Sequence, residues 1–213
     1  MGISKKSIWT VLLNCIGIVT IGLILWNLTS KNDSEADIYY EYKIIRKEQR
    51  LTSSYYLYKV NKKVKHLIDS IAPTSKLNSL PLIETVSKYN IDLAFVLAQG
   101  IIESHFGTQG LARRSNSVWN VYARDGYSDE QIKKINGFYN HPDNSIVPYL
   151  ELLTNKYLVD KPITALLENF VNVDGNRYAS DDNYENKLSD KYIQIKNYLG
   201  SDYEYYVKFK KYE

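Results

Sequence analysis

Residues 92–107 read DLAFVLAQGIIESHFG, and this stretch decides how the rest of the chain is interpreted. Asp92 is a favourable N-cap residue, and Gly107 suits the position just past a helix end. The apolar residues between them cover a face too wide for a helix exposed to solvent, so the stretch is predicted to form a central, buried helix. That face consists of Leu93, Val96, Leu97, Ile101 and Ile102.

Glu103 follows this apolar face directly and has two interpretations. A glutamate near a helix end is ordinarily solvated or ion-paired. However, the C-terminal end of a helix disfavours negative charge, and burial beside Ile102 and Phe106 would raise the pKa of the carboxyl. A carboxylic acid that stays protonated near neutral pH is what a general acid for glycosidic-bond cleavage needs. The spacing alone leaves both interpretations open.

The composition fits one domain with an appendage. The chain has 213 residues, of which 44% are hydrophobic and 24% charged, so it can form a soluble core. Its net charge of +3 is small and its charges are interspersed, which argues against a nucleic-acid partner. The single cysteine excludes an intrachain disulfide and a cysteine-based metal site. The three histidines, His66, His105 and His141, lack ligand spacing, so no metal or cofactor is expected.

Residues 7–30 contain no charged side chain and are predicted to form a transmembrane anchor. The apolar run 8–28 would span roughly 31 Å as a helix, close to the thickness of a bilayer core. Trp9 and Trp26 lie near its ends, where indoles favour the headgroup region. Lys5 and Lys6 precede the run, which predicts that residues 1–6 are cytoplasmic.

A cleaved signal peptide is the alternative interpretation of this segment. Its apolar region would be shorter, and the candidate cleavage site Ser34-Glu35-Ala36 is charged and distant. A lipoprotein signal needs a small residue before Cys15, where Asn14 stands. An uncleaved anchor is therefore favoured. It predicts a single-pass membrane protein whose remaining residues lie outside the cytoplasm, on the periplasmic or cell-wall side.

The remaining chain is predicted to be mainly α-helical. Residues 31–77 are interpreted as a linker and a helical arm that ends before Pro73, and residues 78–200 as the main domain. Within that domain, 118–123 (VWNVYA) and 135–140 (INGFYN) are predicted to form a small β-hairpin lobe. Further helices are predicted after Asp143 or Asn144, at Pro162, and from about Asp182 to Gly200. Residues 201–213 form a Tyr/Lys-rich tail without a predicted structure.

Four segments resemble, in the same order, the bacterial peptidoglycan endo-β-N-acetylglucosaminidases of the FlgJ/Bax type. The central helix carries an AQ-x3-ES-x2-G pattern, RSNSVWNVY is similar to N-N-L-F-G-I-K, YNHPDNSIVPYLELL to Y-x-S-x3-S-(V/I), and NRYASDDNYENKL to Y-A-T-D-P-x-Y. The matching positions are Ala98, Gln99, Glu103, Ser104, Gly107, Asn116, Trp119 (in aromatic character), Tyr139, Ser145, Ile146, Tyr178, Ala179, Asp181 and Tyr184. The resemblance covers about residues 80–200.

This resemblance implies a lysozyme-like helical fold with a small β-lobe over a sugar-binding groove. It also implies hydrolysis of the bond between N-acetylglucosamine and N-acetylmuramic acid, with Glu103 as the general acid. Tyr178 would orient the sugar N-acetyl group or the water, and Trp119 would form a hydrophobic platform for a sugar. The residues expected to bind substrate are Gln99, Ser104, Phe106, Asn116, Trp119, Tyr139 and Tyr184.

The sequence also departs from the family pattern. Asn120 stands in place of the Gly of N-L-F-G-I-K, and Tyr122 in place of its Lys. An inverting enzyme needs a second carboxylate across the sugar from the acid. Asp125 is the first choice for this base, ahead of Asp129 and Glu130. Alternatively, the acetamido group of the substrate itself acts as the nucleophile.

Two other functions are compatible with this kind of fold. A lytic transglycosylase also uses a Glu followed by Ser, but it usually carries a G-L-M-Q run where this chain reads RSNSVWNVY. A non-catalytic wall-binding or scaffold protein is the second alternative, and the retained Glu103 and Tyr178 argue against it. The sequence does not distinguish a cellular enzyme from a phage component, and it does not indicate an oligomeric state.

Overall fold

The computed structural model describes residues 35–121 and 139–210. They belong to two units, one made of residues 1–55 with 208–213 and the other of residues 56–207. Helix α2 (Glu35–Ile71) begins in the first unit and ends, as predicted, shortly before Pro73. The predicted anchor, residues 7–30, lies outside the described residues. None of the helices in the described ranges is both long enough and apolar enough to cross a bilayer.

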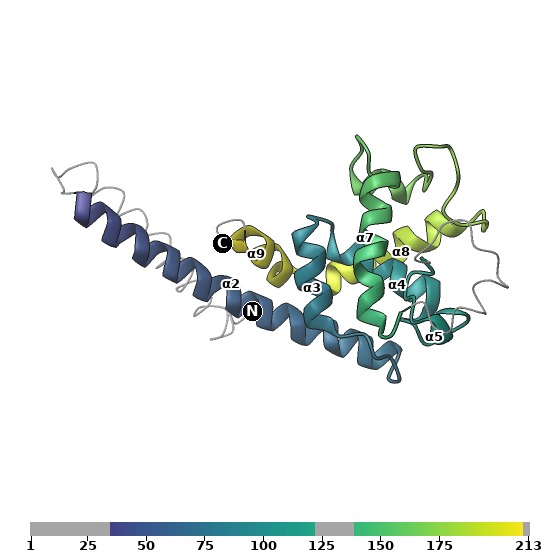
Figure 1. Cartoon of the computed structure of the whole chain (residues 1–213), viewed down its shortest axis with the longest axis horizontal. Coiled ribbons are helices and arrows are strands. Elements are labelled where there is room, and N and C mark those ends of the chain that lie inside the picture. Colours follow the sequence, from purple (N-terminus) through teal and green to yellow (C-terminus); the bar gives the residue numbers. More distant parts are fainter. Residues whose placement is uncertain (1–34, 122–138, 211–213) are drawn as a thin grey trace, which may run out of the picture. The chain divides into compact units, whose positions relative to one another are not determined.

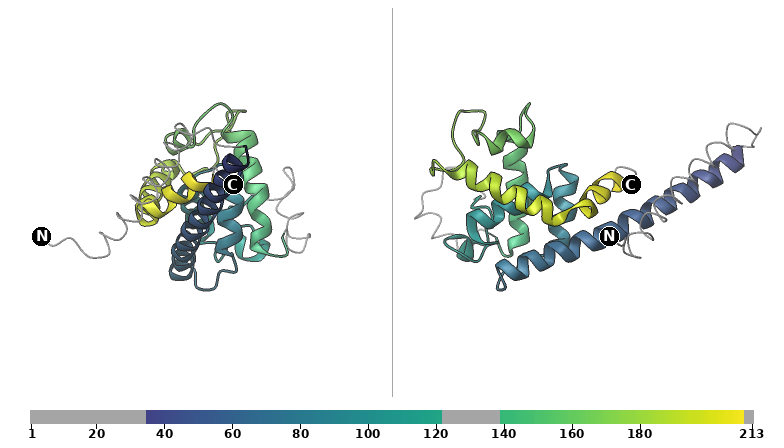
Figure 2. Two further views of the ribbon diagram at one scale, coloured as in Figure 1. Left: turned by 90° about the vertical axis from the view of Figure 1, so that its left-hand side faces the viewer. Right: turned by 180° about the vertical axis from the view of Figure 1, so that it is seen from behind.

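Four helices organise the larger unit: α3 (Ser79–Lys88), α4 (Leu93–Ser104), α7 (Ile146–Leu152) and α8 (Tyr184–Leu199). α4 packs mainly against α8, and α3 contacts both α4 and α7 (Figures 1 and 2). Phe95, Val96 and Leu97 of α4 are completely buried. The prediction of a mainly helical domain around a central, buried α4 is therefore confirmed.

Shorter helices complete this unit. They are α5 (Ala112–Ser115), the 3₁₀ turns η1 (Pro142–Ser145) and η3 (Ile163–Leu167), and the π-helical turn η2 (Leu153–Tyr157). The chain after Gly200, for which the sequence predicted no structure, forms helix α9 (Ser201–Lys210). Tyr206 of α9 is buried, and the backbone N–H of Leu93 donates to the hydroxyl of Tyr203. These contacts fix the N-terminal end of α4.

The C-terminal part of α2 also packs within the larger unit. Val60, Val64 and Ile68 recur at four-residue intervals, and all three are buried. Because residues four apart lie on one side of a helix, this row forms a single contact face.

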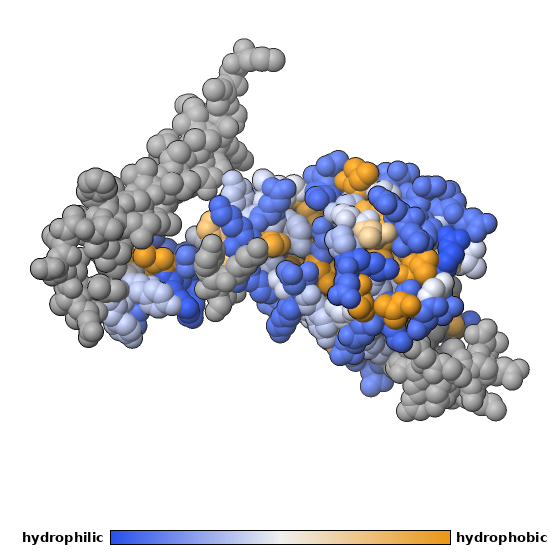
Figure 3. Space-filling model, turned by 90° about the horizontal axis from the view of Figure 1, so that it is seen from above, coloured by the Kyte–Doolittle hydropathy of each residue, from blue (hydrophilic) through white to orange (hydrophobic). Residues whose placement is uncertain are grey.

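The face of the molecule seen in Figure 3 is mostly hydrophilic, and hydrophobic residues appear there in small patches.

The predicted β-hairpin is not found in the described residues. Residues 118–121 form a turn instead of the first strand, and residues 139 and 140 are irregular. The turn is held locally, because the hydroxyl of Ser117 donates to the carbonyl of Val121 and the N–H of Asn120 donates to the carbonyl of Ser117. Within the described ranges the β-structure is limited to a single isolated bridge between Val171 and Arg177. Residues 122–138 lie outside the description.

Candidate active site

Glu103 lies in the last turn of α4, and both of its carboxylate oxygens accept hydrogen bonds. The hydroxyl of Tyr184 donates to Oε1 at 2.5 Å, and Nδ2 of Asn120 donates to Oε2 at 2.9 Å. Burial raises the pKa of Glu103 above its ordinary value of 4.5, although both hydrogen bonds act in the opposite direction. Among the described residues, no lysine or arginine forms an ion pair with this carboxyl. The site therefore favours a protonated carboxylic acid.

A series of buried hydrogen bonds connects Glu103 to α7. Tyr149 of α7 donates to Oε1 of Gln99 at 2.5 Å, and Nε2 of Gln99 donates to the hydroxyl of Tyr184 at 3.2 Å. Because that hydroxyl already accepts a hydrogen bond from Gln99, its own proton is directed to Glu103. The sequence predicted that Gln99 binds substrate. Its side chain is completely buried, so it orients Tyr184 instead and does not contact a sugar directly.

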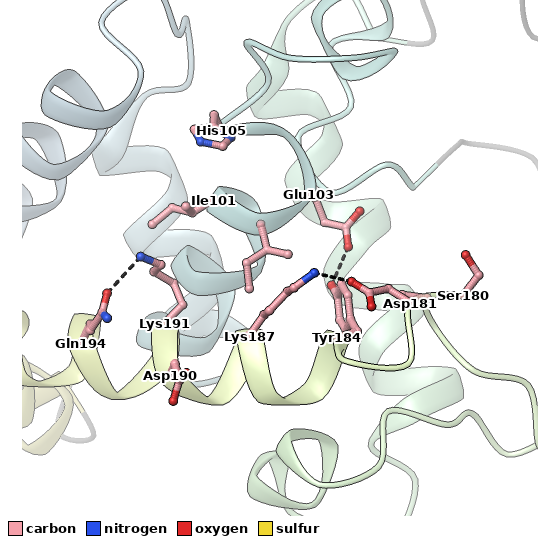
Figure 4. Close-up of a pocket in the computed structure, with 12 residues that line it drawn as sticks. Ile101, Glu103, His105, Ser180, Asp181, Tyr184, Lys187, Asp190, Lys191 and Gln194 are labelled. Carbon is pink, nitrogen blue, oxygen red and sulfur yellow. Dashed lines mark hydrogen bonds and ion pairs between the residues drawn. The ribbon is translucent and has the colours of Figure 1, made fainter.

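An open pocket of about 670 Å³ lies beside Glu103 (Figure 4). The end of α4 forms one side of this pocket, α8 a second side, and residues 179–181 complete it. Along α8, the lining residues Lys187, Lys191 and Gln194 recur every three or four positions, so they lie on one helix face. Lys187 pairs with Asp181 at 2.6 Å, and Lys191 donates to Gln194 at 2.9 Å. The α8 wall of the pocket is therefore polar, whereas Ile101 and Ile102 line the pocket from α4.

The end of α4 differs from its predicted form. The helix stops at Ser104 rather than near Gly107, because His105 and Phe106 both adopt left-handed conformations, with φ of 47° and 53°. This turn places Phe106 in the core, next to Gly100. A Cβ added at Gly100 would lie 3.2 Å from the indole nitrogen of Trp119 and 3.3 Å from the ring of Phe106. The turn that carries Glu103 is therefore tightly packed.

Two predicted substrate-binding residues of this turn have structural roles instead. Phe106 is completely buried and presents no surface to a sugar. Ser104 is buried, donates to the carbonyl of Val118 at 2.5 Å, and accepts from the N–H of Gly107 at 2.8 Å. Both residues fix the direction in which the chain leaves the helix, so the sequence prediction is corrected for them.

Trp119 is also corrected, because it does not form a platform for a sugar. Its side chain is completely buried, and its ring stacks on Tyr149 with centroids 4.5 Å apart. Its indole N–H donates to the carbonyl of Val96 at 3.0 Å. The Trp119 ring therefore fills the core next to the site. Its packing places the neighbouring Asn120 against Glu103.

Tyr178 lies beside the site but does not hydrogen-bond to Glu103. Its hydroxyl donates to the backbone carbonyl of Trp119 at 2.8 Å, and its ring stacks on Phe170 with centroids 4.5 Å apart. Its ring centroid lies 5.9 Å from that of Tyr184. Burial, with the charge of Glu103 as the next cause, raises the pKa of Tyr178 well above its usual value, so the hydroxyl stays neutral.

Asn116 and Tyr139 connect the chain on the two sides of residues 122–138. Nδ2 of Asn116 donates to the carbonyl of Tyr139 at 2.6 Å, and the hydroxyl of Tyr139 donates to the carbonyl of Val121 at 3.1 Å. Neither of them lines the pocket beside Glu103. The predicted base Asp125 lies outside the described residues. Within the described part of the chain, no three His, Cys, Asp or Glu side chains gather in a way that would hold a metal ion.

Sequence reasoning did not identify two features of this site. One is the contact of Asn120 with Glu103, and the only available signal was that Asn120 occupies a glycine position of the family pattern. The other is the row of pocket residues on α8 that follows the predicted Tyr184 and consists of Lys187, Lys191 and Gln194. Their spacing in the sequence was the available signal, although it gave no reason to connect them with Glu103.

A helical domain that buries one carboxyl and raises its pKa at the wall of an open pocket has the features of a glycoside hydrolase. Comparison with protein families agrees with this class. A family model described as mannosyl-glycoprotein endo-beta-N-acetylglucosaminidase matches residues 81–197, which is more than half of the chain, so the chain belongs to this glucosaminidase family. The membership makes the protein a glycoside hydrolase and supports peptidoglycan as its substrate. No curated protein matches the chain.

Proposed function

We propose that this protein hydrolyses the glycosidic bond between N-acetylglucosamine and N-acetylmuramic acid in peptidoglycan, with Glu103 as the general acid. The observation that carries the proposal is the environment of Glu103. Its carboxyl borders an open pocket, its hydrogen-bonding partners among the described residues are neutral, and burial raises its pKa. A buried carboxyl with a raised pKa is suited to donate a proton to the oxygen of the leaving sugar.

The two hydrogen bonds to Glu103 support this role at the moment of proton transfer. When the carboxyl loses its proton, Tyr184 and Asn120 each donate a hydrogen bond to one of its oxygens. Hydrogen bonds to an ionised acceptor are stronger than those to a neutral one, so both contacts strengthen as the negative charge develops. They stabilise the transition state more than the ground state, which is the condition for catalysis.

A lysozyme-like arrangement is part of the proposal. Its support is the position of the acid at the C-terminal end of a central helix that packs against α8 and is hydrogen-bonded to Tyr149 of α7 and to Asn120. The base remains a sequence-based proposal. Asp125 is the first candidate, and the acetamido group of the substrate is the alternative nucleophile.

The cellular location is also a proposal that rests on the sequence. The uncharged run at residues 7–30 and the preceding Lys5 and Lys6 support a single-pass anchor with a cytoplasmic N-terminus. The catalytic domain would then lie on the periplasmic or cell-wall side, where peptidoglycan is found.

Digestion of purified peptidoglycan by the full-length protein, followed by mass analysis of the fragments, tests the proposed reaction. We expect fragments that end in reducing N-acetylglucosamine from the wild type and none from Glu103→Gln. Fragments with 1,6-anhydromuramic ends would identify a lytic transglycosylase instead. Co-sedimentation with peptidoglycan without any fragments would identify a binding or scaffold protein. Equal fragment release by the wild type and Glu103→Gln would refute the assigned acid.

A further inference from the structure

The backbone at position 120 has a conformation that few residues adopt. Asn120 has a φ of 53°, which lies in the left-handed region. Glycine adopts this region without steric cost, and asparagine is one of the few other residues that tolerate it. The family pattern that this segment resembles has glycine here, so the replacement by asparagine keeps the backbone shape and adds a side chain.

The added side chain reaches Glu103 in two places. Nδ2 of Asn120 donates to the backbone carbonyl of Glu103 at 3.1 Å and to its carboxylate Oε2 at 2.9 Å. An amide NH₂ group has two hydrogens, so it can serve both acceptors at once. The carbonyl of Glu103 is among the last carbonyls of α4, which have no partner within the helix. One amide group therefore holds both the helix end and its acidic side chain.

We propose that Asn120 is a positioning residue for the acid: it fixes Oε2 of Glu103 while Tyr184 fixes Oε1, and it stabilises the carboxylate that remains after proton transfer. This inference rests on the proposed function. Because hydrogen bonds hold both oxygens, the carboxyl group of Glu103 cannot rotate. The side of the carboxyl group that borders the pocket therefore keeps its orientation. In a chain with glycine at this position, this second hydrogen bond would be absent.

The groups around Glu103 determine how a change at position 120 would act. Tyr149 of α7, Tyr178 of the loop before α8, and Tyr184 of α8 all have raised pKa values, chiefly because of burial, so they stay neutral. His105, Asp181 and Lys187 line the same pocket, and Asp181 is paired with Lys187. The hydrogen bond from Asn120 lowers the pKa of Glu103 against the larger effect of burial. Its removal must therefore raise that pKa.

Three variants of the full-length protein separate this role from packing. Asn120→Gly removes the amide but keeps the left-handed backbone without strain. Asn120→Asp keeps the size and tolerates the same backbone, but it replaces the donor by a carboxylate that repels that of Glu103. Asn90→Gly is the matched control, because Asn90 has the same φ, 54°, and lies before the first residue of α4, at the other end of the helix.

Two measurements are made on each variant. The first is a titration of Glu103 by the ¹³C signal of its side-chain carboxyl, assigned by its absence from Glu103→Gln. The second is the pH profile of kcat and kcat/KM on purified peptidoglycan. We expect the midpoint of the Glu103 titration and the alkaline limb of the rate profile to move together. Both should rise from wild type to Asn120→Gly, and rise further in Asn120→Asp.

The kinetic parameters add a second criterion. We expect kcat of Asn120→Gly to fall about tenfold, the loss of roughly one hydrogen bond to a developing charge. KM should change little, because Asn120 does not line the pocket beside Glu103. Asn90→Gly should match the wild type in both measurements. Circular dichroism verifies that each variant is folded.

The outcomes are distinct. If Asn120 serves only packing, Asn120→Asp behaves as the wild type because it has nearly the same shape, and the inference is overturned. An unchanged Glu103 titration in both position-120 variants also overturns it, even where peptidoglycan is digested. If the wild type releases no fragments, the proposed function fails, and the titration, which needs no substrate, still decides whether Asn120 holds the carboxyl.

Discussion

Glu103 and Glu185 are both held by hydrogen bonds at the ends of the two helices that pack most closely, yet their pKa values move in opposite directions. Glu103 is the residue before the last in α4, and Glu185 is the second residue of α8. Burial raises the pKa of Glu103. Burial also acts to raise that of Glu185, but the backbone N–H of Phe170 and the guanidinium of Arg177 outweigh it, so the pKa falls below 4.5.

The difference shows which surroundings make a carboxyl an acid. Glu185 accepts from the N–H of Phe170 at 3.1 Å and pairs with Arg177 at 2.7 Å. It also lies in the first turn of its helix, where the macrodipole favours negative charge. Glu103 lies in a last turn, where the dipole disfavours negative charge, and its partners among the described residues are a neutral phenol and a neutral amide. Hydrogen bonds from neutral side chains thus leave Glu103 with a raised pKa, whereas backbone N–H groups and a guanidinium make Glu185 a structural anion.

The largest expected effect comes from Glu103→Gln. Because glutamine cannot donate a proton to the leaving sugar, we expect kcat on purified peptidoglycan to fall by about 10³-fold. In the wild type, kcat/KM should decrease as pH rises through the raised pKa of Glu103, since the ionised form cannot act as an acid. Measurement of fragment release against pH tests both expectations. An alkaline limb that persists unchanged in the residual activity of Glu103→Gln would assign that limb to another group.

Tyr184→Phe has the next largest effect. It removes the donor to Oε1 of Glu103 and the acceptor for Nε2 of Gln99. The developing carboxylate then lacks one of its two hydrogen bonds, so we expect kcat to fall by roughly 10- to 100-fold. The alkaline limb should shift to higher pH, because the hydrogen bond from Tyr184 lowers the pKa of Glu103. A lower kcat with an unshifted limb would mean that Tyr184 contributes through packing alone.

Glu185→Gln should change stability rather than activity. The pKa of Glu185 is lowered in the folded state, so its charge stabilises the fold above pH 4.5, and this stabilisation is lost as pH falls through the folded pKa. At pH 7 we expect the free energy of unfolding to decrease by about 1 kcal/mol, with fragment release within about twofold of the wild type. Urea unfolding at pH 7 and at a series of pH values below 4.5 tests this, because the difference should shrink as the pH falls through the lowered pKa of Glu185.

Asp182→Asn is expected to have the smallest effect. Asp182 pairs with Arg177 at 2.9 Å, but 99% of its side chain is exposed. Solvent screens such a pair, so its contribution to stability is small. We expect the thermal unfolding midpoint and the activity to equal those of the wild type. A clear decrease in the midpoint would show that Asp182, and not Glu185, is the main partner of Arg177.

The helices of the domain could be predicted because their signals are local. The apolar period of α4, its N-cap Asp92, and the end of α8 before Gly200 are all present in the sequence, and the structure has them. Glu103 was singled out by its position in the helix, but that position left two interpretations open, and only the resemblance to the glucosaminidases assigned it as the acid. The two consecutive left-handed residues after Ser104 could not be predicted, because His adopts that conformation only in a minority of cases and Phe has no preference for it.

The contacts between segments were harder to predict than the segments themselves. Trp119 was expected at the groove because the family resemblance implies a sugar platform there, but its burial depends on Gly100 and Tyr149, which lie far from it in the sequence. Asn120 looked like a departure from the family pattern that put the local contacts in doubt. Its role becomes visible only when the turn at 116–121 is placed against the end of α4.

The close fit among Gly100, Phe106 and Trp119 has a consequence for how the enzyme fails on heating. The helical turn that carries the acid contains Gly100 and packs against the other two residues, so it has no freedom to loosen on its own. In enzymes whose acid sits on a fraying loop, inactivation precedes melting. Here the loss of catalysis should coincide with the melting of the whole domain.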